Sequence, residues 1–331
     1  MLWGYACMTS QVSAQVKPAW AGEDWLSRFV NLLIRTKPIY AVMKSQARRV
    51  MIKTAQKNDI LWEETVQELE SAIAHTGTVQ TLANISNPNI TAYPSYYTKP
   101  LHAYDEGNLC WQAAFEAEPA TYSIALRVWP TESLTWQAAQ ARMRDSFFEV
   151  IDQYALNPVK DILDMGCSVG ISTRALHKHY ASKQSQPPRT IGLDLSPYML
   201  SVAHLRNEDG SIAAWIHANA EETGLPSESF DVITLQSVLH ELPRHITSII
   251  FNEAKRLLRP GGCLAIFDNN PKSAVIQNLP PVLFTLMKST EPWSDDFYTF
   301  DIEAALRESG FEHVVSAETD PRHRAIVARK S

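Results

Sequence analysis

The run Ile162-Leu163-Asp164-Met165-Gly166-Cys167-Ser168-Val169-Gly170 decides the fold of this 331-residue chain. Its first residues are mostly apolar, which is typical of a strand that is buried on both faces. The two glycines permit a tight turn and a close approach of the backbone to a neighbour, and a helical stretch follows them. A strand, a glycine turn and a helix predict a ligand site at the carboxyl end of a parallel sheet. An ordinary strand-to-helix turn is the alternative.

Beyond residue 158, short apolar runs alternate with helical stretches, which predicts a parallel sheet with helices on both faces. The expected strands are 161–165, 190–195, 213–217, 230–235, 263–268, 312–317 and 324–328. Residues 24–75 predict three helices, 76–108 a long loop, 109–128 a helix and a strand, and 132–156 a helix. We therefore divide the chain into a helical cap and lid region, 1–131, and an α/β ligand-binding domain, 132–331.

Further motifs follow the glycine loop in a fixed order. The second strand ends at Asp194, a carboxylate placed to accept both hydroxyls of a ribose, and Ser196-Pro197 then begins a helix. Ala218-Asn219-Ala220-Glu221 follows the third strand. Leu257-Leu258-Arg259-Pro260-Gly261-Gly262 precedes the fifth strand. Each motif alone is weak, but the ordered set is specific.

The ordered set resembles the class I S-adenosylmethionine-dependent methyltransferases, in particular their small-molecule type 11 family, over about residues 140–331. The resemblance implies a doubly wound, Rossmann-like sheet of seven mostly parallel strands, the last antiparallel, with the helical region as a cap. It implies methyl transfer from S-adenosylmethionine to a small molecule, with S-adenosylhomocysteine as product. No Gly-x-x-x-x-Gly-Lys-Ser/Thr motif points to a nucleotide triphosphatase. The Leu-Arg-Pro-Gly-Gly turn favours a methyltransferase over a nicotinamide dehydrogenase.

By position, the resemblance places Asp164 and Gly166 at the methionine moiety of the donor and Asp194 at its ribose. Asn219 and Ala220 would meet the adenine edge. The whole donor site implied in this way is Asp164, Gly166, Cys167, Ser168, Gly170, Asp194, Leu195, Asn219, Ala220 and Gln236.

Three features depart from the family pattern. Ser168 replaces the usual middle glycine, and Asn219 replaces the usual aspartate at the adenine. A polar insertion at 183–189 lengthens the segment between the first two strands. Each departure is compatible with donor binding.

The donor carries an activated methyl group, so the protein must chiefly align the acceptor, exclude water and remove a proton. His240, just after the fourth strand, is the candidate base, because an ordinary histidine titrates near neutral pH. A structural role at a helix start is the alternative. Oxygen is preferred as the methyl acceptor, with nitrogen and carbon as the alternatives.

Acceptor contacts are expected from the segment after the fifth strand and from the aromatic loop at 93–106, which would act as a lid. The candidates are Tyr97, Tyr104, Asn269, Glu291, Trp293 and Tyr298. An aromatic plug without a binding role is the alternative. We expect no metal site, because no group of His, Asp and Glu shows ligand spacing along the chain.

The net charge of −6 argues against a nucleic-acid partner, yet residues 25–57 carry eight basic residues and no acidic one. This basic segment is either a solvated helical surface or a peripheral membrane contact. The second interpretation would suit a quinone, lipid or isoprenoid acceptor. No secretory leader is recognised in the first 22 residues, and a cytoplasmic location is expected. A donor-binding protein without transferase activity is the third alternative.

Overall fold

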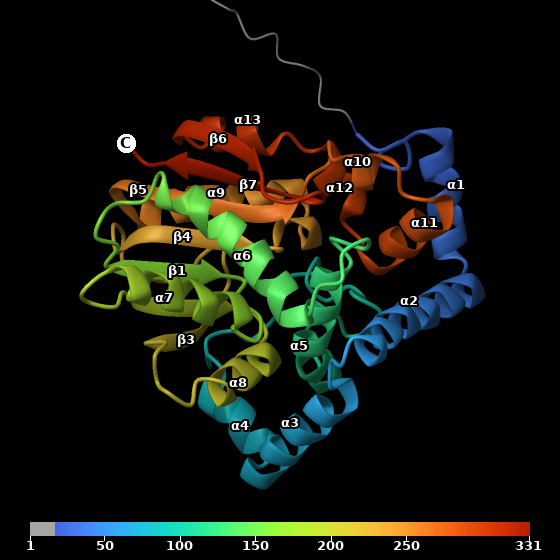
Figure 1. The fold of residues 1–331 in the computed structure, drawn as a ribbon, viewed down its shortest axis with the longest axis horizontal. Helices are drawn as coiled ribbons and strands as arrows, with labels where there is room; N and C mark the ends of the chain where they lie inside the picture. Colours follow the sequence, from blue (N-terminus) through green and yellow to red (C-terminus); the bar gives the residue numbers. More distant parts are fainter. Residues whose placement is uncertain (1–16) are drawn as a thin grey trace, which may run out of the picture.

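A seven-stranded sheet with the order β3-β2-β1-β4-β5-β7-β6 forms the centre of the structure (Figure 1). The computed structural model describes residues 17–331; residues 1–16, which include most of the stretch examined for a leader, lie outside the described residues. The strands are β1 Asp161–Met165, β2 Arg189–Asp194, β3 Ala214–His217, β4 Phe230–Gln236, β5 Leu258–Asn269, β6 Glu312–Glu318 and β7 His323–Arg329. β7 runs antiparallel to both β5 and β6, and the other pairs are parallel. The predicted doubly wound sheet is confirmed.

Alternate residues of the central strands face opposite sides of the sheet and enter two different cores. Ile162 and Val232 pack with α6, Trp136–Asp152, and α7, Ile171–Lys183. Leu163 and Ile233 pack with α9, Arg244–Leu257, and α13, Ile302–Glu308. The continuous apolar strands in the sequence therefore reflect helices on both faces of the sheet.

The order of strands reverses at β1, whose neighbours are β2 on one side and β4 on the other. The connections from β1 and from β4 consequently leave on opposite sides, and a crevice forms at their carboxyl ends. The glycine turn after β1 and the short helix η1, Leu239–Glu241, after β4 flank this crevice. The sheet topology thus sets the location of the site.

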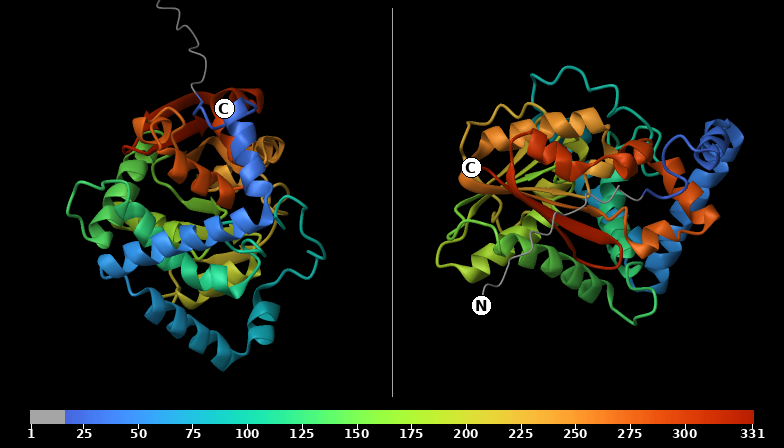
Figure 2. Two further views of the ribbon diagram at one scale, coloured as in Figure 1. Left: turned by 90° about the vertical axis from the view of Figure 1, so that its right-hand side faces the viewer. Right: turned by 90° about the horizontal axis from the view of Figure 1, so that it is seen from above.

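The N-terminal helices wrap one end of the sheet, as the side view shows (Figure 2). They are α1 Trp25–Arg35, α2 Lys37–Lys57, α3 Trp62–Thr76, α4 Thr78–Ile85 and α5 Trp111–Leu126. The remaining helices are α8 Pro197–Leu205, α10 Ala274–Gln277, α11 Pro281–Thr290 and α12 Ser294–Thr299. Trp20 and Val30 share a hydrophobic core with the sheet, so the cap packs directly on the ligand-binding part.

Buried carboxylates of α5 attach the cap to the sheet-bearing part. Glu118 accepts from Arg174 of α7 at 3.2 Å and from Arg206, just after α8, at 3.0 Å. Glu116 accepts from the hydroxyl of Tyr104 at 2.6 Å and pairs with Arg48 of α2. Because buried charges are costly unless they are paired, these contacts hold α2, α5 and the lid in one arrangement.

Two local expectations were wrong. The stretch 76–108 contains the helix α4, and the strand expected within 109–128 does not form, because α5 continues to Leu126. Ala113, Ala114 and Phe115 bury one face of α5 against α3 and α8, and this packing outweighs the β-branched and aromatic residues near its end. Among the described residues, no helix combines the length and the apolar character needed to cross a bilayer.

Gly170 tests how tightly the glycine turn is packed. Its φ is +76°, and a Cβ there would lie 2.3 Å from the Trp215 ring. We expect Gly170→Ala to lower the free energy of unfolding by about 2–4 kcal/mol, from backbone strain and overpacking together. Gly210→Ala is the matched control, since Gly210 has a φ of +63° with nothing within 4 Å, and should cost about 1 kcal/mol. Equal losses in urea unfolding would contradict this account.

Candidate active site

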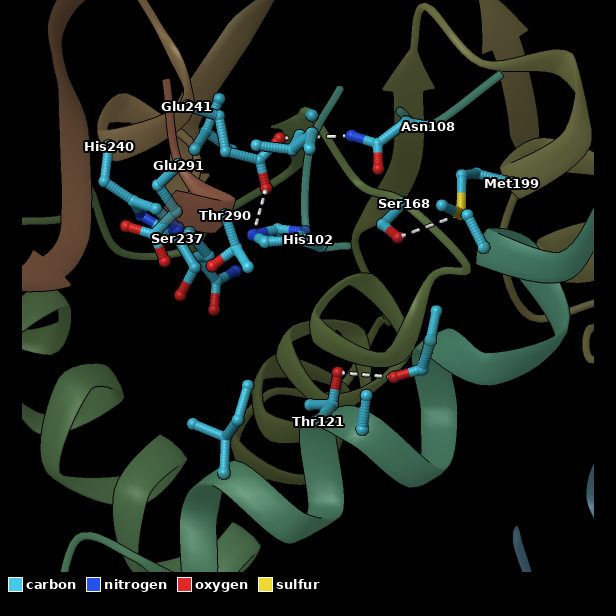
Figure 3. A pocket seen from close by; sticks show the side chains of 18 of the residues that line it. His102, Asn108, Thr121, Ser168, Met199, Ser237, His240, Glu241, Thr290 and Glu291 are labelled. Carbon is cyan, nitrogen blue, oxygen red and sulfur yellow. Dashed lines mark hydrogen bonds and ion pairs between the residues drawn. The ribbon is translucent and has the colours of Figure 1, made fainter. Parts of the chain in front are cut away.

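One cavity of about 480 Å³ runs from the glycine turn to α11. That volume is within the range of small-molecule sites. Its walls come from the carboxyl ends of β1, β2 and β4, from the lid, and from α2, α5 and α11 (Figure 3). The donor-site residues that line it are Gly166, Cys167, Ser168, Asp194, Leu195, Asn219, Ala220 and Gln236.

The glycine turn curls around the end of β2. The N–H groups of Gly166 and Cys167 donate to the Leu193 carbonyl at 2.7 and 3.0 Å. A Cβ on Gly166 would lie 2.6 Å from a methyl group of Val238, so no larger residue fits there without movement. Ser168 has a φ of +50° and so adopts the left-handed conformation for which glycine is usually chosen. This departure from the family pattern leaves the shape of the turn intact.

Asp194 is the polar centre of the donor end. Its carboxylate accepts from the N–H of Ser168 at 2.7 Å and from the N–H of Ser196 at 2.8 Å, and the Tyr97 hydroxyl lies 3.5 Å away. Burial, with a smaller contribution from the charge of Glu241, raises its pKa to about 6. Fixed in this way and facing the cavity, the carboxylate is placed to accept ribose hydroxyls.

Asp164 and Gly170 do not line the cavity, so a direct contact of either with the donor is not supported. Asp164 is buried and accepts from the hydroxyls of Thr173 and Thr234 at 2.7 and 2.6 Å and from the Gln236 amide at 3.3 Å. It thereby positions Gln236, which does line the cavity. Gly170 is required instead for packing against Trp215.

The loop between α4 and α5 covers the donor end and forms the lid. Tyr96 donates to Glu221 at 2.6 Å, and the Asn87 N–H donates to His217 at 2.9 Å. Further along, the Asn108 carbonyl accepts from Ser196 at 2.6 Å. Tyr96, Tyr97, His102 and Tyr104 of this loop line the cavity, and its action as a lid stays a prediction.

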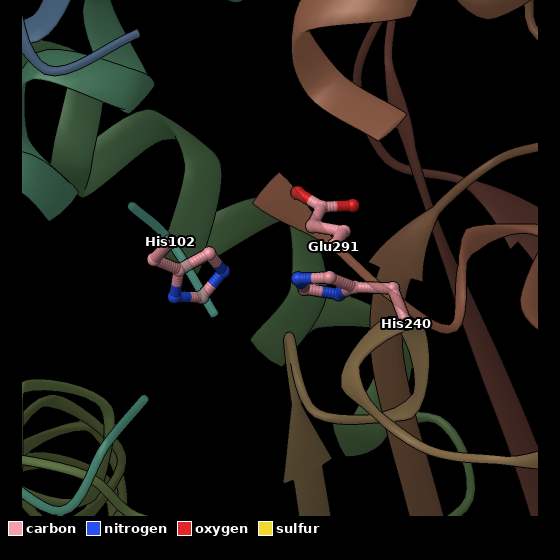
Figure 4. Close-up of side chains that lie close together, drawn as sticks. All are labelled: His102, His240 and Glu291. Atoms are coloured by element: carbon pink, nitrogen blue, oxygen red, sulfur yellow. The ribbon is translucent and has the colours of Figure 1, made fainter. Parts of the chain in front are cut away.

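Imidazole and carboxylate groups lie together at the opposite end of the cavity, around His102, His240, Glu241 and Glu291. We call this part the acceptor end. His240 Nδ1 lies 2.8 Å from Asp268 Oδ1, and Asn108 donates to Glu241 at 3.1 Å. Glu291 Oε2 is buried without a hydrogen-bond partner among the described residues, and the three side chains His102, His240 and Glu291 point toward a common space (Figure 4).

Burial and neighbouring charges shift the pKa values of the groups at the acceptor end. Burial alone would lower the pKa of His240, but Asp268 and the nearby carboxylates Glu291 and Glu241 raise it to about 10. Burial raises the pKa of Glu241 to about 7 and lowers that of His102 to about 4. His240 is thus a hydrogen-bond donor in the ligand-free site at neutral pH, and its role as a base stays a prediction.

The predicted acceptor contacts divide into three groups. Tyr104, Asn269, Glu291 and Trp293 line the cavity, and Asn269 also accepts from Arg322 at 2.8 Å. Tyr97 lines it at the donor end, beside Asp194. Tyr298 does not line the cavity.

The prediction for Tyr298 was wrong because its ring is fully buried in the core against Trp20 and Phe297. His102 and Arg322 line the cavity but were missed. Only the position of His102 inside the aromatic loop offered a signal for it.

Comparison with known proteins identifies the family of the chain. Residues 163–266 match the family of methyltransferase domains. The chain is 30% identical over 210 residues to an uncharacterised methyltransferase, C70.08c, of Schizosaccharomyces pombe, with 56% of this chain and 74% of that protein covered. It is 29% identical over 170 residues to a ubiquinone biosynthesis O-methyltransferase of Hahella chejuensis, with 50% and 68% covered. A demethylmenaquinone methyltransferase of Bacillus licheniformis is 35% identical over 100 residues, with 30% and 40% covered.

The chain belongs to the class I S-adenosylmethionine-dependent methyltransferases. Its residues fit the donor: Asp194 offers a fixed carboxylate at the end of β2, Gly166 leaves room beside Val238, and Asn219 and Ala220, which are predicted to meet the adenine, line the cavity. The cavity continues beyond these residues to the acceptor end. A donor-binding protein without activity would lack an acceptor cleft. The cavity in this structure extends past the donor-site residues to η1 and α11, so such a cleft is present.

Donor binding should depend on the charge of Asp194. As the pH falls through about 6, this carboxylate takes up a proton and loses its strength as an acceptor for ribose hydroxyls. We expect the Kd for S-adenosylhomocysteine, measured by calorimetry from pH 5 to 8, to rise by up to about tenfold toward pH 5, since about a tenth of the carboxylate is still ionised there.

Asp194→Asn supplies the control for this titration. It should bind weakly and with less pH dependence than the wild type, because an amide does not titrate between pH 5 and 8; Tyr97 and Glu241, which face the side chain, remain as in the wild type. A wild-type Kd that is constant across the range would contradict the assignment of Asp194 to the ribose.

Proposed function

We propose that this enzyme methylates a hydroxyl oxygen of a partly apolar small molecule bound at the acceptor end of the cavity. The observation that carries the proposal is Glu291. Its Oε2 is buried without a hydrogen-bond partner among the described residues, and the residue lines the cavity together with His240. A buried carboxylate oxygen without a donor is costly, and an acceptor hydroxyl would supply that donor.

The walls around this polar group support a partly apolar acceptor. The apolar side chains that line the cavity from α2, α5 and α11 and the residues preceding α11 include Val50, Met51, Ile124, Leu279, Leu283, Leu286 and Met287. Burial of a hydrocarbon portion against such residues contributes about 25 cal/mol per Å². The acceptor end would therefore bind a molecule with one polar end and a larger apolar surface.

The residues of the chain divide the work of the reaction. S-adenosylmethionine supplies an activated methyl group, which the acceptor oxygen displaces from sulfur. Asp194 and the glycine turn hold the donor, while Glu291 and His240 orient the acceptor oxygen. The lid excludes water, since Tyr96 and Tyr97 cover the donor end. Removal of the hydroxyl proton by His240 is a further part of the proposal.

Replacing Glu291 tests the acceptor site. We expect Glu291→Gln to lower kcat/KM by about 10- to 100-fold, because a charged hydrogen-bond acceptor for the hydroxyl is lost. Donor affinity should be unchanged. The measurement is transfer of labelled methyl groups to a panel of phenols, aliphatic alcohols, quinols and amines.

Glu308→Gln, on the exposed surface of α13, is the control and should match the wild type. Transfer by the wild type to amines or carbon atoms alone would refute the proposed oxygen acceptor. An unchanged kcat/KM for Glu291→Gln would refute the role of Glu291.

We propose as a second candidate that the acceptor is lipid-soluble and that the enzyme takes it from a membrane surface. Trp25, Phe29 and Leu32 form an exposed stripe along α1, with 79%, 52% and 63% of their surfaces exposed. Ile39 and Val42 extend it along α2. A contiguous exposed stripe of large apolar residues is typical of an interaction surface.

Charge and location support this interpretation. The basic side chains that are exposed on α1 and α2 and make no ion pair with a described residue are Arg28, Arg35, Lys37, Arg49, Lys53 and Lys57. The acidic Glu68 of α3 pairs with Arg206 instead. Leu283 of α11 lines the cavity and is also partly exposed, so the apolar interior reaches the surface beside α2, against which α11 packs. The names of the quinone-linked relatives agree with such an acceptor.

Vesicle binding tests the second candidate. We expect Phe29→Ser to reduce sedimentation with vesicles of phosphatidylcholine and phosphatidylglycerol by about tenfold or more, because burial of a large apolar side chain is lost. Binding of the wild type should also fall as salt is raised. Val79→Ser, which removes an exposed apolar side chain from α4, is the matched control. Equal recovery of the wild type with and without vesicles would refute membrane contact.

A further inference from the structure

Three potential metal ligands meet at the acceptor end although they lie far apart in the sequence. His102 comes from the lid, His240 from η1, and Glu291 from the residue after α11. Each offers one ligand atom, and these atoms all lie within 4.8 Å of one another. The side chains converge on one space at the cavity wall (Figure 4). The expectation of no metal cluster rested on spacing along the chain, which carries no information about this convergence.

The surroundings of the three side chains resemble those of metal ligands. His240 Nδ1 is engaged by Asp268 at 2.8 Å, which leaves its Nε2 free for a cation. Such a carboxylate behind a ligating imidazole fixes its orientation and raises its basicity. His102 has Glu241 behind it, with 3.6 Å between Nε2 and Oε1. Glu291 Oε2 has no hydrogen-bond partner among the described residues.

The backbone holds the ligands together in advance. The N–H of His102 donates to the carbonyl of Thr290, the residue before Glu291, at 2.8 Å. His102 and Ala103 both have left-handed conformations, with φ of +50° and +74°. A non-glycine residue in this region costs about 1 kcal/mol or more and persists where its surroundings require it. The lid is therefore held in the conformation that presents His102 to the other two residues.

Charge also favours a cation here. Asp268 lies 2.8 Å from His240 Nδ1, and Glu291 converges with His240 on the same space, so two carboxylates lie beside this imidazole. Excess buried negative charge is stabilised by a bound metal ion.

We propose that His102, His240 and Glu291 bind one divalent first-row transition-metal ion, of which Zn²⁺ is the representative. Two imidazoles and one carboxylate match the ligand preferences of Zn²⁺ and its neighbours, whereas Mg²⁺ and Ca²⁺ prefer oxygen ligands alone. Three protein ligands leave a coordination position open, as in catalytic zinc sites. That position faces the cavity, where an acceptor oxygen can occupy it.

The site deepens the proposed oxygen methylation, and its catalytic use rests on that function. With the cation bound, His240 is a ligand and no longer the base, and the hydroxyl of the acceptor, bound to the cation, would release its proton to water more readily. An oxygen lone pair then forms the new O–C bond while the C–S bond of the donor breaks and its electron pair stays on sulfur. The products are a methylated oxygen, neutral S-adenosylhomocysteine and one proton in solution.

Direct metal binding tests the site independently of turnover. The full chain, stripped of metal by chelator, is titrated with Co²⁺ while the visible absorption of the ion is recorded, and with Zn²⁺ by calorimetry. We expect one ion per chain and absorption bands of a low-coordinate site. His102→Gln and Glu291→Gln should each weaken binding by at least about 100-fold, and Asp268→Asn by about 10- to 100-fold.

His245→Gln, on the exposed surface of α9, is the matched control and should bind as the wild type does. Circular dichroism and S-adenosylhomocysteine binding establish that each variant is folded. Lack of stoichiometric binding, or equal affinity of His102→Gln, Glu291→Gln and the wild type, overturns the metal site.

The two proposals can fail separately. Transfer to hydroxyls that continues unchanged in a protein that binds no Co²⁺ overturns the site and leaves the oxygen acceptor standing. Stoichiometric Co²⁺ binding that depends on His102, together with methylation of amines alone, supports the site and overturns the proposed function.

Discussion

The buried carboxylate of Asp164 connects the parts of the fold on which the donor site depends. It accepts from Thr173 at the start of α7, from Thr234 within β4 and from Gln236 at the end of β4. Helix α7 follows β1 in the chain, and β4 pairs with β1 on the side away from β2. A carboxylate that is buried and fully engaged is much more favourable than one that lacks partners, so the three donors and Asp164 require one another. Asp164 thereby fixes the position of α7, which follows the glycine turn, relative to β4, which precedes η1 and His240.

One cavity joins the predicted donor and acceptor sites because residues of the cap line it together with residues of the sheet-bearing part. The lid contacts the donor end through Tyr96 and Tyr97 and the acceptor end through His102 and Asn108. Paired buried carboxylates on α5 fix the base of this lid. The α/β domain positions the donor, and the cap adds the apolar walls that would select the acceptor.

The α/β part of the chain was predictable because its signals are local. Buried strands give continuous apolar runs, and the turn at Gly166 and Gly170 has positive φ values, a local backbone requirement that glycine meets. The approximate strand limits followed from this, whereas the resemblance to the methyltransferase family suggested Asn219 and Gln236, which line the cavity with Asp194. Asp164 shows the limit of such reasoning, since a position within a motif does not reveal whether a side chain faces the ligand or the core.

The acceptor end was less predictable because it is assembled from distant segments. Tyr298 and Trp293 look alike in the sequence, but one fills the core and the other lines the cavity. His102 has no significance until the lid is folded against Thr290. Packing of the cap against the sheet determines whether these side chains face the core or the cavity. The pattern of residues within one segment does not predict that packing.

The contact between Tyr97 and Asp194 has a consequence for the kinetic order of the substrates. The lid tyrosine lies beside the carboxylate that ribose hydroxyls would use, so the donor must displace or share that contact as it enters. The same lid also contains His102, which contacts Thr290 at the acceptor end. A movement of the lid when the donor binds would therefore change the shape of the acceptor end. We therefore expect compulsory-order binding, with the donor first and the demethylated product last to leave.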